Sequence, residues 1–219
     1  MEDWSTKQEY FILCSQGCCG SVHVRDCLQQ PGINMRQTWM SMSKLNIMFH
    51  NQHFRNPPKS FNRKDYKVLY MYGDPRNILL SSLNRVRPGP KPGVNRWNWH
   101  LYCKYMQADV EYFGDSEERT IDRLLQDNYD PLRLEDHFLS WLNVNAEYPL
   151  MLLKYEALEE PKTFQHVLDF FEVEGDYSYG WRPRETSYLK LTLEQQVQIT
   201  ELFKDLLKIQ AEIPPVYIR

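Results

Sequence analysis

A glycine-bearing loop near the start of the chain has the residue types of a phosphate-binding loop. The segment SQGCCGS at 15–21 follows a short apolar run at 10–14 and precedes a helical pattern that begins at Ser21. Main-chain amides and the positive end of a helix attract anions, and glycine lets a ligand approach the backbone. The loop lacks a Lys-Ser or Lys-Thr ending, which disfavours an ordinary nucleoside triphosphatase or kinase. A plain strand-to-helix turn is the alternative interpretation.

Two histidines are candidates for proton transfer. His50 and His53 follow the apolar run LNIMF at 45–49, which is typical of a strand. Imidazole titrates near neutral pH, which suits a general base, and strand ends often carry functional residues. We take His50 as the candidate base and His53 as its substitute. A histidine without a role in chemistry is the alternative.

Thiols crowd the same part of the chain, in a set that comprises Cys14, Cys18, Cys19, His23 and Cys27. His23 and Cys27 are one helical turn apart, but no C-x-x-C spacing is present, so we expect no metal site. Cys18 stands at a helix start, where it is either a reactive thiol or a small packed side chain. Five cysteines and a polar, acidic N-terminus predict a cytoplasmic protein with reduced thiols and no secretory signal.

Short apolar runs alternate with helical patterns along the chain. Strands are expected at 10–14, 45–49, 67–72 and 150–155, and helices at 21–30, 75–84, 109–112, 117–127, 134–143, 161–171 and from Thr192 onward. Asp74 is the expected N-cap of the helix at 75–84, with Pro75 at its first position. The last helix would bury an apolar face formed by Leu193, Val197, Ile199, Leu202, Phe203, Leu206 and Leu207. This alternation predicts a three-layer α/β fold, with a mostly parallel central sheet flanked by helices, as a single domain over 1–219.

Composition and charge narrow the class of ligand. The 219 residues include 26 basic and 29 acidic side chains, and their mean hydropathy is -0.62. A hydrophobic content of 42% excludes a disordered chain, and the absence of a long apolar run excludes a membrane span. Residues 55–96 contain ten basic and two acidic side chains, so one anionic ligand is favoured over nucleic acid. Within this stretch, RVRPGPKPGVNR at 85–96 is expected to be an exposed loop.

Five segments match one known family in order and spacing, over about residues 10–205. They are GSVHVRDCL at 20–28, NIMFH at 46–50, VLYMYGDPRN at 68–77 with Ser81, Ser140-Trp141, and LLKYEAL at 152–158. The set resembles the Gly-Thr-Thr-Trp, Lys-Thr-His, Arg-Asp-Pro-Arg-Asp, Ser-Trp and Tyr-Glu-Asp-Leu stretches of the sulfotransferases that use 3′-phosphoadenosine 5′-phosphosulfate (PAPS).

The resemblance implies a P-loop-type fold and transfer of a sulfuryl group from PAPS, as co-substrate, to a hydroxyl-bearing acceptor, either a small molecule or a glycan. It implies that His50 is the base that removes the acceptor proton and that Ser81 binds the 3′-phosphate of PAPS. It places the phosphosulfate on the loop residues Gly17, Cys18, Cys19, Gly20, Ser21 and Val22.

Three cationic positions of the family are neutral in this chain. The loop lysine aligns with Cys18, the strand lysine with Met48, and the 3′-phosphate arginine with Gly73. Each lost charge-assisted contact costs about 1.5–3 kcal/mol. Candidate replacements are Arg25, Arg76, Arg182 and Arg184. The alternative function is a catalytically inactive member of the family that binds a nucleotide or another anion, or serves as a protein-interaction module.

Overall fold

The computed structural model describes residues 10–16, 19–29, 55–60, 66–86, 108–109, 112, 120–173, 180 and 187–219. In this part of the chain the strands β1 (Tyr10–Ser15), β2 (Tyr66–Tyr72), β3 (Leu150–Lys154) and β4 (Val216–Ile218) form one sheet in the order β1-β2-β3-β4. The first three strands are parallel, and β4 pairs antiparallel with β3. This mixed, mostly parallel sheet confirms the expected α/β class.

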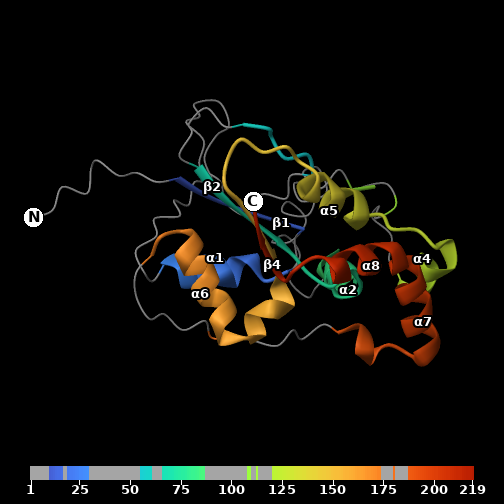
Figure 1. Ribbon diagram of the computed structural model, residues 1–219. Helices are drawn as coiled ribbons and strands as arrows, with labels where there is room; N and C mark the ends of the chain where they lie inside the picture. Colours follow the sequence, from blue (N-terminus) through green and yellow to red (C-terminus); the bar gives the residue numbers. More distant parts are fainter. Residues whose placement is uncertain are drawn as a thin grey trace, which may run out of the picture.

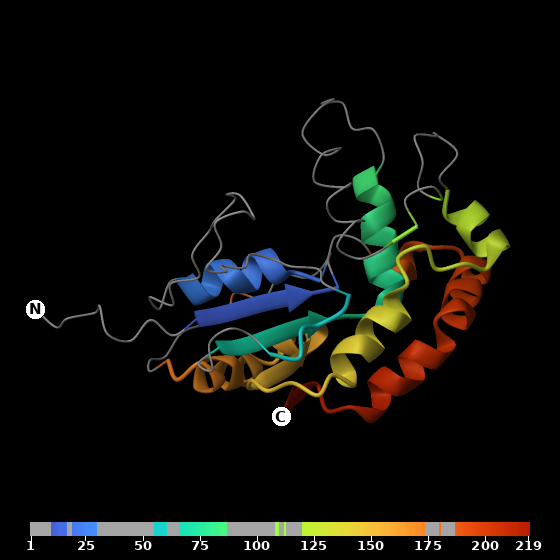
Figure 2. The same cartoon turned by 90° about the horizontal axis from the view of Figure 1, so that it is seen from above.

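Helices flank the sheet and gather at one end of it. They are α1 (Ser21–Gln29), α2 (Pro75–Val86), α4 (Ile121–Asp127), α5 (Leu134–Leu142), α6 (Pro161–Phe170), α7 (Leu193–Leu202) and α8 (Lys204–Glu212), with short 3-10 helices η1 (Tyr155–Glu159) and η2 (Tyr188–Lys190). In Figure 1, α1 and α6 lie on one side of the sheet and α5 on the other. Figure 2 shows the arrowheads of β1 and β2 pointing toward α2, α5, α7 and α8.

The strand β2 is buried from Val68 to Tyr72 because helices cover both of its faces. Each side chain from Val68 to Tyr72 is 0% exposed. Parallel strands of this kind are nearly continuous apolar runs instead of alternating ones, which is why KVLYMY was recognisable as a strand. Burial of one large aliphatic side chain stabilises the fold by about 1.5–3 kcal/mol, so this strand anchors the core.

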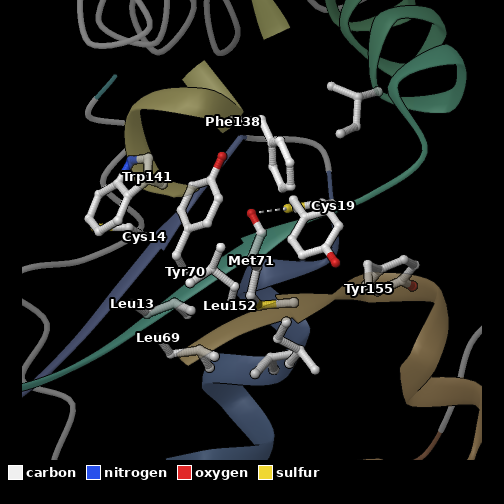
Figure 3. Packing of buried hydrophobic residues seen from close by; sticks show 14 of the residues in the cluster. Leu13, Cys14, Cys19, Leu69, Tyr70, Met71, Phe138, Trp141, Leu152 and Tyr155 are labelled. Atoms are coloured by element: carbon white, nitrogen blue, oxygen red, sulfur yellow. Dashed lines mark hydrogen bonds between the residues drawn. The ribbon is translucent and has the colours of Figure 1, made fainter. Parts of the chain in front are cut away.

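Aromatic packing joins β2 to α5. The Tyr70 ring stacks on Trp141, with ring centroids 4.8 Å apart and 7° between the planes. The Tyr70 hydroxyl and His137 Nδ1 are 2.8 Å apart, so two buried polar groups satisfy each other inside the stack. Figure 3 shows Tyr70 pointing toward Trp141 and Phe138, whereas Leu69 points the other way. The alternation along β2 thus fixes α5 on one face of the sheet.

A half-buried acid, Asp130, supports the start of α5. The Asp130 carboxylate accepts hydrogen bonds from the main-chain amides of Leu132, at 3.0 Å, and Leu134, at 2.6 Å. It thereby does the work of a helix cap, because Arg133, which precedes the helix, has a φ of 53° and no capping side-chain bond. Burial raises the pKa of the Asp130 carboxyl to about 6, and these amide hydrogen bonds oppose the shift.

We expect Asp130→Asn to flatten the pH dependence of stability. The folded-state pKa of Asp130, about 6, lies above the value of about 3.9 for an unfolded chain. The contribution of Asp130 to the free energy of unfolding is therefore fully present below about pH 4 and is lost as the pH rises through 6. Urea unfolding at pH 4.5 and 7.0 should show wild type losing about 2 kcal/mol more than the variant. Asp169→Asn, at an exposed position of α6, is the control, and equal pH slopes of wild type and Asp130→Asn would refute the assignment.

Several expected elements differ in the structure. The helix predicted from Thr192 breaks at Phe203 into α7 and α8, because Ile199, Phe203 and Leu206 all face the core across the break. The prediction that Leu193 and Val197 are buried was wrong, since they are 81% and 70% exposed.

Other boundaries shift near the ends of elements. The predicted helix at 109–112 is wrong at its described residues, because Asp109 is not helical and its carboxylate accepts the Tyr112 amide proton in a local turn. The basic loop was expected to begin at 85, but α2 runs to Val86. The remainder of that loop, at 87–96, and the strand predicted at 45–49 lie outside the described residues. Among the described helices, none has the length and apolar character needed to span a bilayer.

Candidate functional site

The segments that follow β1, β2 and β3 meet at one edge of the sheet. The Cys19 thiol lies 3.6 Å from the main-chain oxygen of Met71, a contact drawn as a dashed line in Figure 3. The Asp74 amide donates to Glu156 Oε1 at 3.1 Å. The carboxyl ends of parallel strands are the usual ligand edge of such sheets. The segments that resemble a phosphate loop, a strand-to-helix turn and a Tyr-Glu stretch are therefore neighbours in space.

Hydrogen bonds shape the loop after β1 on both flanks. The main-chain amide of Gln16 donates to the main-chain oxygen of Met71 at 3.1 Å, and the side-chain Nε2 of Gln16 donates to the main-chain oxygen of Leu134 at 2.9 Å. The Ser15 hydroxyl donates to the Ser21 hydroxyl oxygen at 3.2 Å across the loop. These contacts tie the end of the buried strand β1 to the first turn of α1, where the main-chain amides of a helix point toward its N-terminal end.

Gly20 is the one glycine in this loop whose geometry is described, and it is required for two reasons. Its φ is +74°, a conformation that residues with a Cβ rarely adopt. A Cβ built on Gly20 would lie 2.1 Å from Cε2 of Tyr155, the residue that follows β3. Tyr155 is buried, so its ring cannot swing into solvent. The space beside Gly20, which a Cβ would need, is therefore occupied by the Tyr155 ring.

The turn after β2 is held by local charges. Asp74 precedes α2, and its Oδ1 accepts the Arg76 amide at 3.0 Å, as expected of an N-cap before Pro75. The Arg76 guanidinium returns to the same carboxylate, with Nη2 2.7 Å from Oδ2. Arg76 also lies 3.7 Å from the centre of the Tyr188 ring and donates to Thr200 Oγ1 at 3.2 Å. The N-cap prediction is confirmed, while the guanidinium is engaged within the protein.

Ser81 lies on α2, two turns into the helix. The residue is half-buried, and its hydroxyl makes no hydrogen bond within the described part of the chain. Its neighbour Ser82 is fully buried. Ser81 therefore presents a hydroxyl that can still donate to an anion.

The C-terminal part of the chain is tied to the same edge. The Asn77 Oδ1 atom accepts the Tyr188 amide at 2.9 Å, and buried Gln210 donates from Nε2 to the Gly73 oxygen at 3.3 Å. On α1, His23 Nε2 lies 2.8 Å from the oxygen of Gly180. Because a carbonyl oxygen only accepts, Nε2 carries the proton in this contact. The residues that bound segment 181–186 on each side, at 180 and 187–188, are therefore placed beside α1 and α2.

Glu156 adds a negative charge at this edge. Glu156 is half-buried and accepts the Asp74 amide proton. Burial, and then the Glu156 charge, raise the pKa of the Tyr72 hydroxyl, so this phenol stays protonated at neutral pH. Burial likewise raises the pKa of the Cys14 thiol, which makes that cysteine an inert packed residue.

The structure brings some predicted site residues together and leaves others undescribed. Cys19, Gly20 and Ser21 lie at the strand edge, Val22 is in the first turn of α1, and Ser81 lies two turns into α2. Gly17, Cys18, Met48, His50, Arg182 and Arg184 lie outside the described residues, and the Arg25 side chain is not described. Among described residues, no cluster of His, Cys, Asp or Glu could hold a metal ion.

Sequence reasoning assigned no role to Gln16, Tyr155 or Glu156, although each makes a contact that shapes the site. The signal for Tyr155 and Glu156 was present, because they lie in the segment that resembles Tyr-Glu-Asp-Leu. The contact of Gln16 with Leu134 spans 118 positions and has no local signature.

Comparison with known proteins agrees with this arrangement. The family model of the sulfotransferase domain matches residues 15–205, which is most of the chain. No curated protein matches the chain. The matched range begins at the last residue of β1 and includes the loop, the turn after β2 and the Tyr-Glu stretch after β3. The chain therefore belongs to the sulfotransferase domain family.

Proposed function

We propose that this protein transfers a sulfuryl group from PAPS to a hydroxyl-bearing acceptor, a small molecule or a glycan, in the cytoplasm. The observation that supports this most is the meeting of the glycine loop, the β2–α2 turn and the Tyr-Glu stretch at one strand edge of a sulfotransferase domain. Each of these three segments came from a different part of the sequence. Their convergence is what a nucleotide co-substrate needs.

The residues of the edge fit an anionic nucleotide in two respects. The start of α1 offers main-chain amides beside Gly20, and such helix starts favour phosphate and sulfate groups. The Ser81 hydroxyl has no partner among the described residues and can donate to the 3′-phosphate. Arg182 and Arg184 are proposed to add positive charge there, because the residues on either side of 181–186 are bound to α1 and α2.

The proposed chemistry is one in-line displacement. PAPS supplies an activated sulfuryl group, whose sulfur–oxygen bridge breaks as the acceptor oxygen bonds to sulfur. His50 removes the proton from the acceptor hydroxyl, which makes that oxygen a better nucleophile. The amides of the loop at 17–22 and the α1 start stabilise the negative charge that grows on the departing oxygen.

One observation favours the alternative of an inactive, anion-binding member. Gly73, which takes the place of a cationic residue, is buried, and its oxygen is bound by Gln210. Arg76, the nearest cation in sequence, is paired with Asp74. We therefore leave Arg76 out of the proposed ligand set. Turnover and nucleotide binding must be measured separately to distinguish the two functions.

Calorimetric titration with 3′-phosphoadenosine 5′-phosphate (PAP), the product nucleotide, tests the proposal. We expect wild type to bind PAP and Ser81→Ala to bind it about tenfold or more weakly, since a hydrogen bond to a charged group contributes about 1.5–3 kcal/mol. Ser140→Ala is the matched control, because that hydroxyl bonds the Asp136 oxygen on α5. No heat at millimolar PAP would refute the proposal, and equal affinity of both variants would refute the role of Ser81.

A further inference from the structure

The turn after β2 contains an acid exactly where the proposed function needs positive potential. Asp74 directly precedes α2, the helix that carries Ser81, and Glu156 contacts its amide. Two carboxylates near an anion would repel it, and like charges at close range oppose binding by several kcal/mol when they are uncompensated. Something at the turn must cancel this charge if a nucleotide binds.

Arg76 contacts Asp74 and can cancel the charge of that carboxylate. Its Nε donates to both oxygens of Asp74, at 2.9 and 3.2 Å, and its Nη2 donates to Oδ2 at 2.7 Å. The side chains are 16% and 15% exposed, so water screens the pair only partly. A two-point arginine–carboxylate pair of this geometry is among the strongest that proteins form.

The third nitrogen of Arg76 points elsewhere in the protein. Nη1 donates to Thr200 Oγ1 on α7, and the guanidinium plane covers the Tyr188 ring. All three nitrogens are thus engaged with the turn itself and with the C-terminal helices. The orientation of the guanidinium is therefore set by contacts within the protein, and each of its nitrogens already has a partner there.

We propose that Arg76 is a positioning residue that acts on the nucleotide site through Asp74, by cancelling the charge of that carboxylate. The inference rests on the proposed function. It differs from direct phosphate binding in one respect: Arg76 is needed only while Asp74 is charged. Removal of the arginine alone should therefore weaken nucleotide binding, and removal of both charges together should restore it.

Four proteins separate the two roles by calorimetric titration with PAP: wild type, Arg76→Gln, Asp74→Asn and the double variant. We expect Arg76→Gln to weaken binding about tenfold, which corresponds to about 1.4 kcal/mol. Asp74→Asn should bind at least as tightly as wild type, because it releases a cation and asparagine caps helices as well as aspartate does. The double variant should return to within about threefold of wild type.

Two further measurements make the result decisive. The loss in Arg76→Gln should shrink at high salt, since repulsion from Asp74 is screened. A double variant as weak as Arg76→Gln would overturn the inference and identify Arg76 as a direct ligand. Wild type that does not bind PAP would refute the proposed function instead. In that case the same four proteins are titrated with pyrophosphate. The positioning role then requires that Arg76→Gln binds pyrophosphate more weakly than wild type and that the double variant does not.

Discussion

Gly20→Ala is expected to lower the free energy of unfolding by about 3 kcal/mol or more, from two separate causes. A φ of +74° disfavours any residue with a Cβ, by about 1–2 kcal/mol. The new methyl group would also lie 2.1 Å from Cε2 of the buried Tyr155 ring. Because this contact joins the loop after β1 to the residue after β3, relief of the clash must displace one side of the proposed site. Urea unfolding of both proteins measures the loss.

The two causes can be separated in the same experiment. Tyr155→Ala removes the ring, so in that background Gly20→Ala should cost only the conformational part of the free energy of unfolding. The effects of the two substitutions on this free energy should therefore be non-additive by about 1 kcal/mol or more. Gly180→Ala is the matched control, because a Cβ there meets nothing within 4 Å. A loss at Gly20 no larger than that at Gly180 would show that the Tyr155 contact does not constrain the loop.

His50→Ala is expected to reduce kcat by about 10²–10⁴-fold, with PAP affinity unchanged. A general base acts only as the acceptor proton leaves, so its removal should spare the binding of the nucleotide. The measurement is steady-state turnover with PAPS, alongside calorimetric titration with PAP. His166→Ala, at an exposed position of α6, is the control that should leave turnover and PAP affinity unchanged.

The pattern of losses identifies the base. A fully active His50→Ala protein would exclude His50, and a loss confined to His53→Ala would transfer the role to its neighbour. Loss of PAP affinity in His50→Ala would instead place this residue among the nucleotide contacts. If wild type binds PAP and shows no turnover with any hydroxyl acceptor, the inactive alternative is favoured.

Much of the fold could be predicted because its signals are local. The run YFILC and the run KVLYMY are apolar throughout, as strands covered on both faces must be, and both became strands of the parallel sheet. Asp74-Pro75 predicted a helix start, and the structure has Asp74 capping α2. Hydrophobic spacing located α5, whose Phe138 and Trp141 are fully buried.

Predictions were weaker where a residue's environment depends on distant parts of the chain. Leu193 and Val197 fit a helical apolar stripe, yet they are exposed because the helix breaks at Phe203 and turns another face inward. The short strand β4 was not expected, since three residues carry little pattern and pair with β3 from 65 positions away. Spacing along one helix cannot report which neighbour will cover it.

The sequence by itself determined the α/β class, the strand–loop–helix at the start of the chain and the likeness to sulfotransferases, because these depend on neighbouring residues and on their order. Only the tertiary structure decided what those residues contact. Gly20 faces Tyr155 across 135 positions, and Arg76 is committed to Asp74, Tyr188 and Thr200. Such contacts arise when the sheet brings separate strand ends together, and no local pattern records them. The candidate phosphate-binding glycine and the candidate phosphate-binding arginine both contact other side chains of the protein.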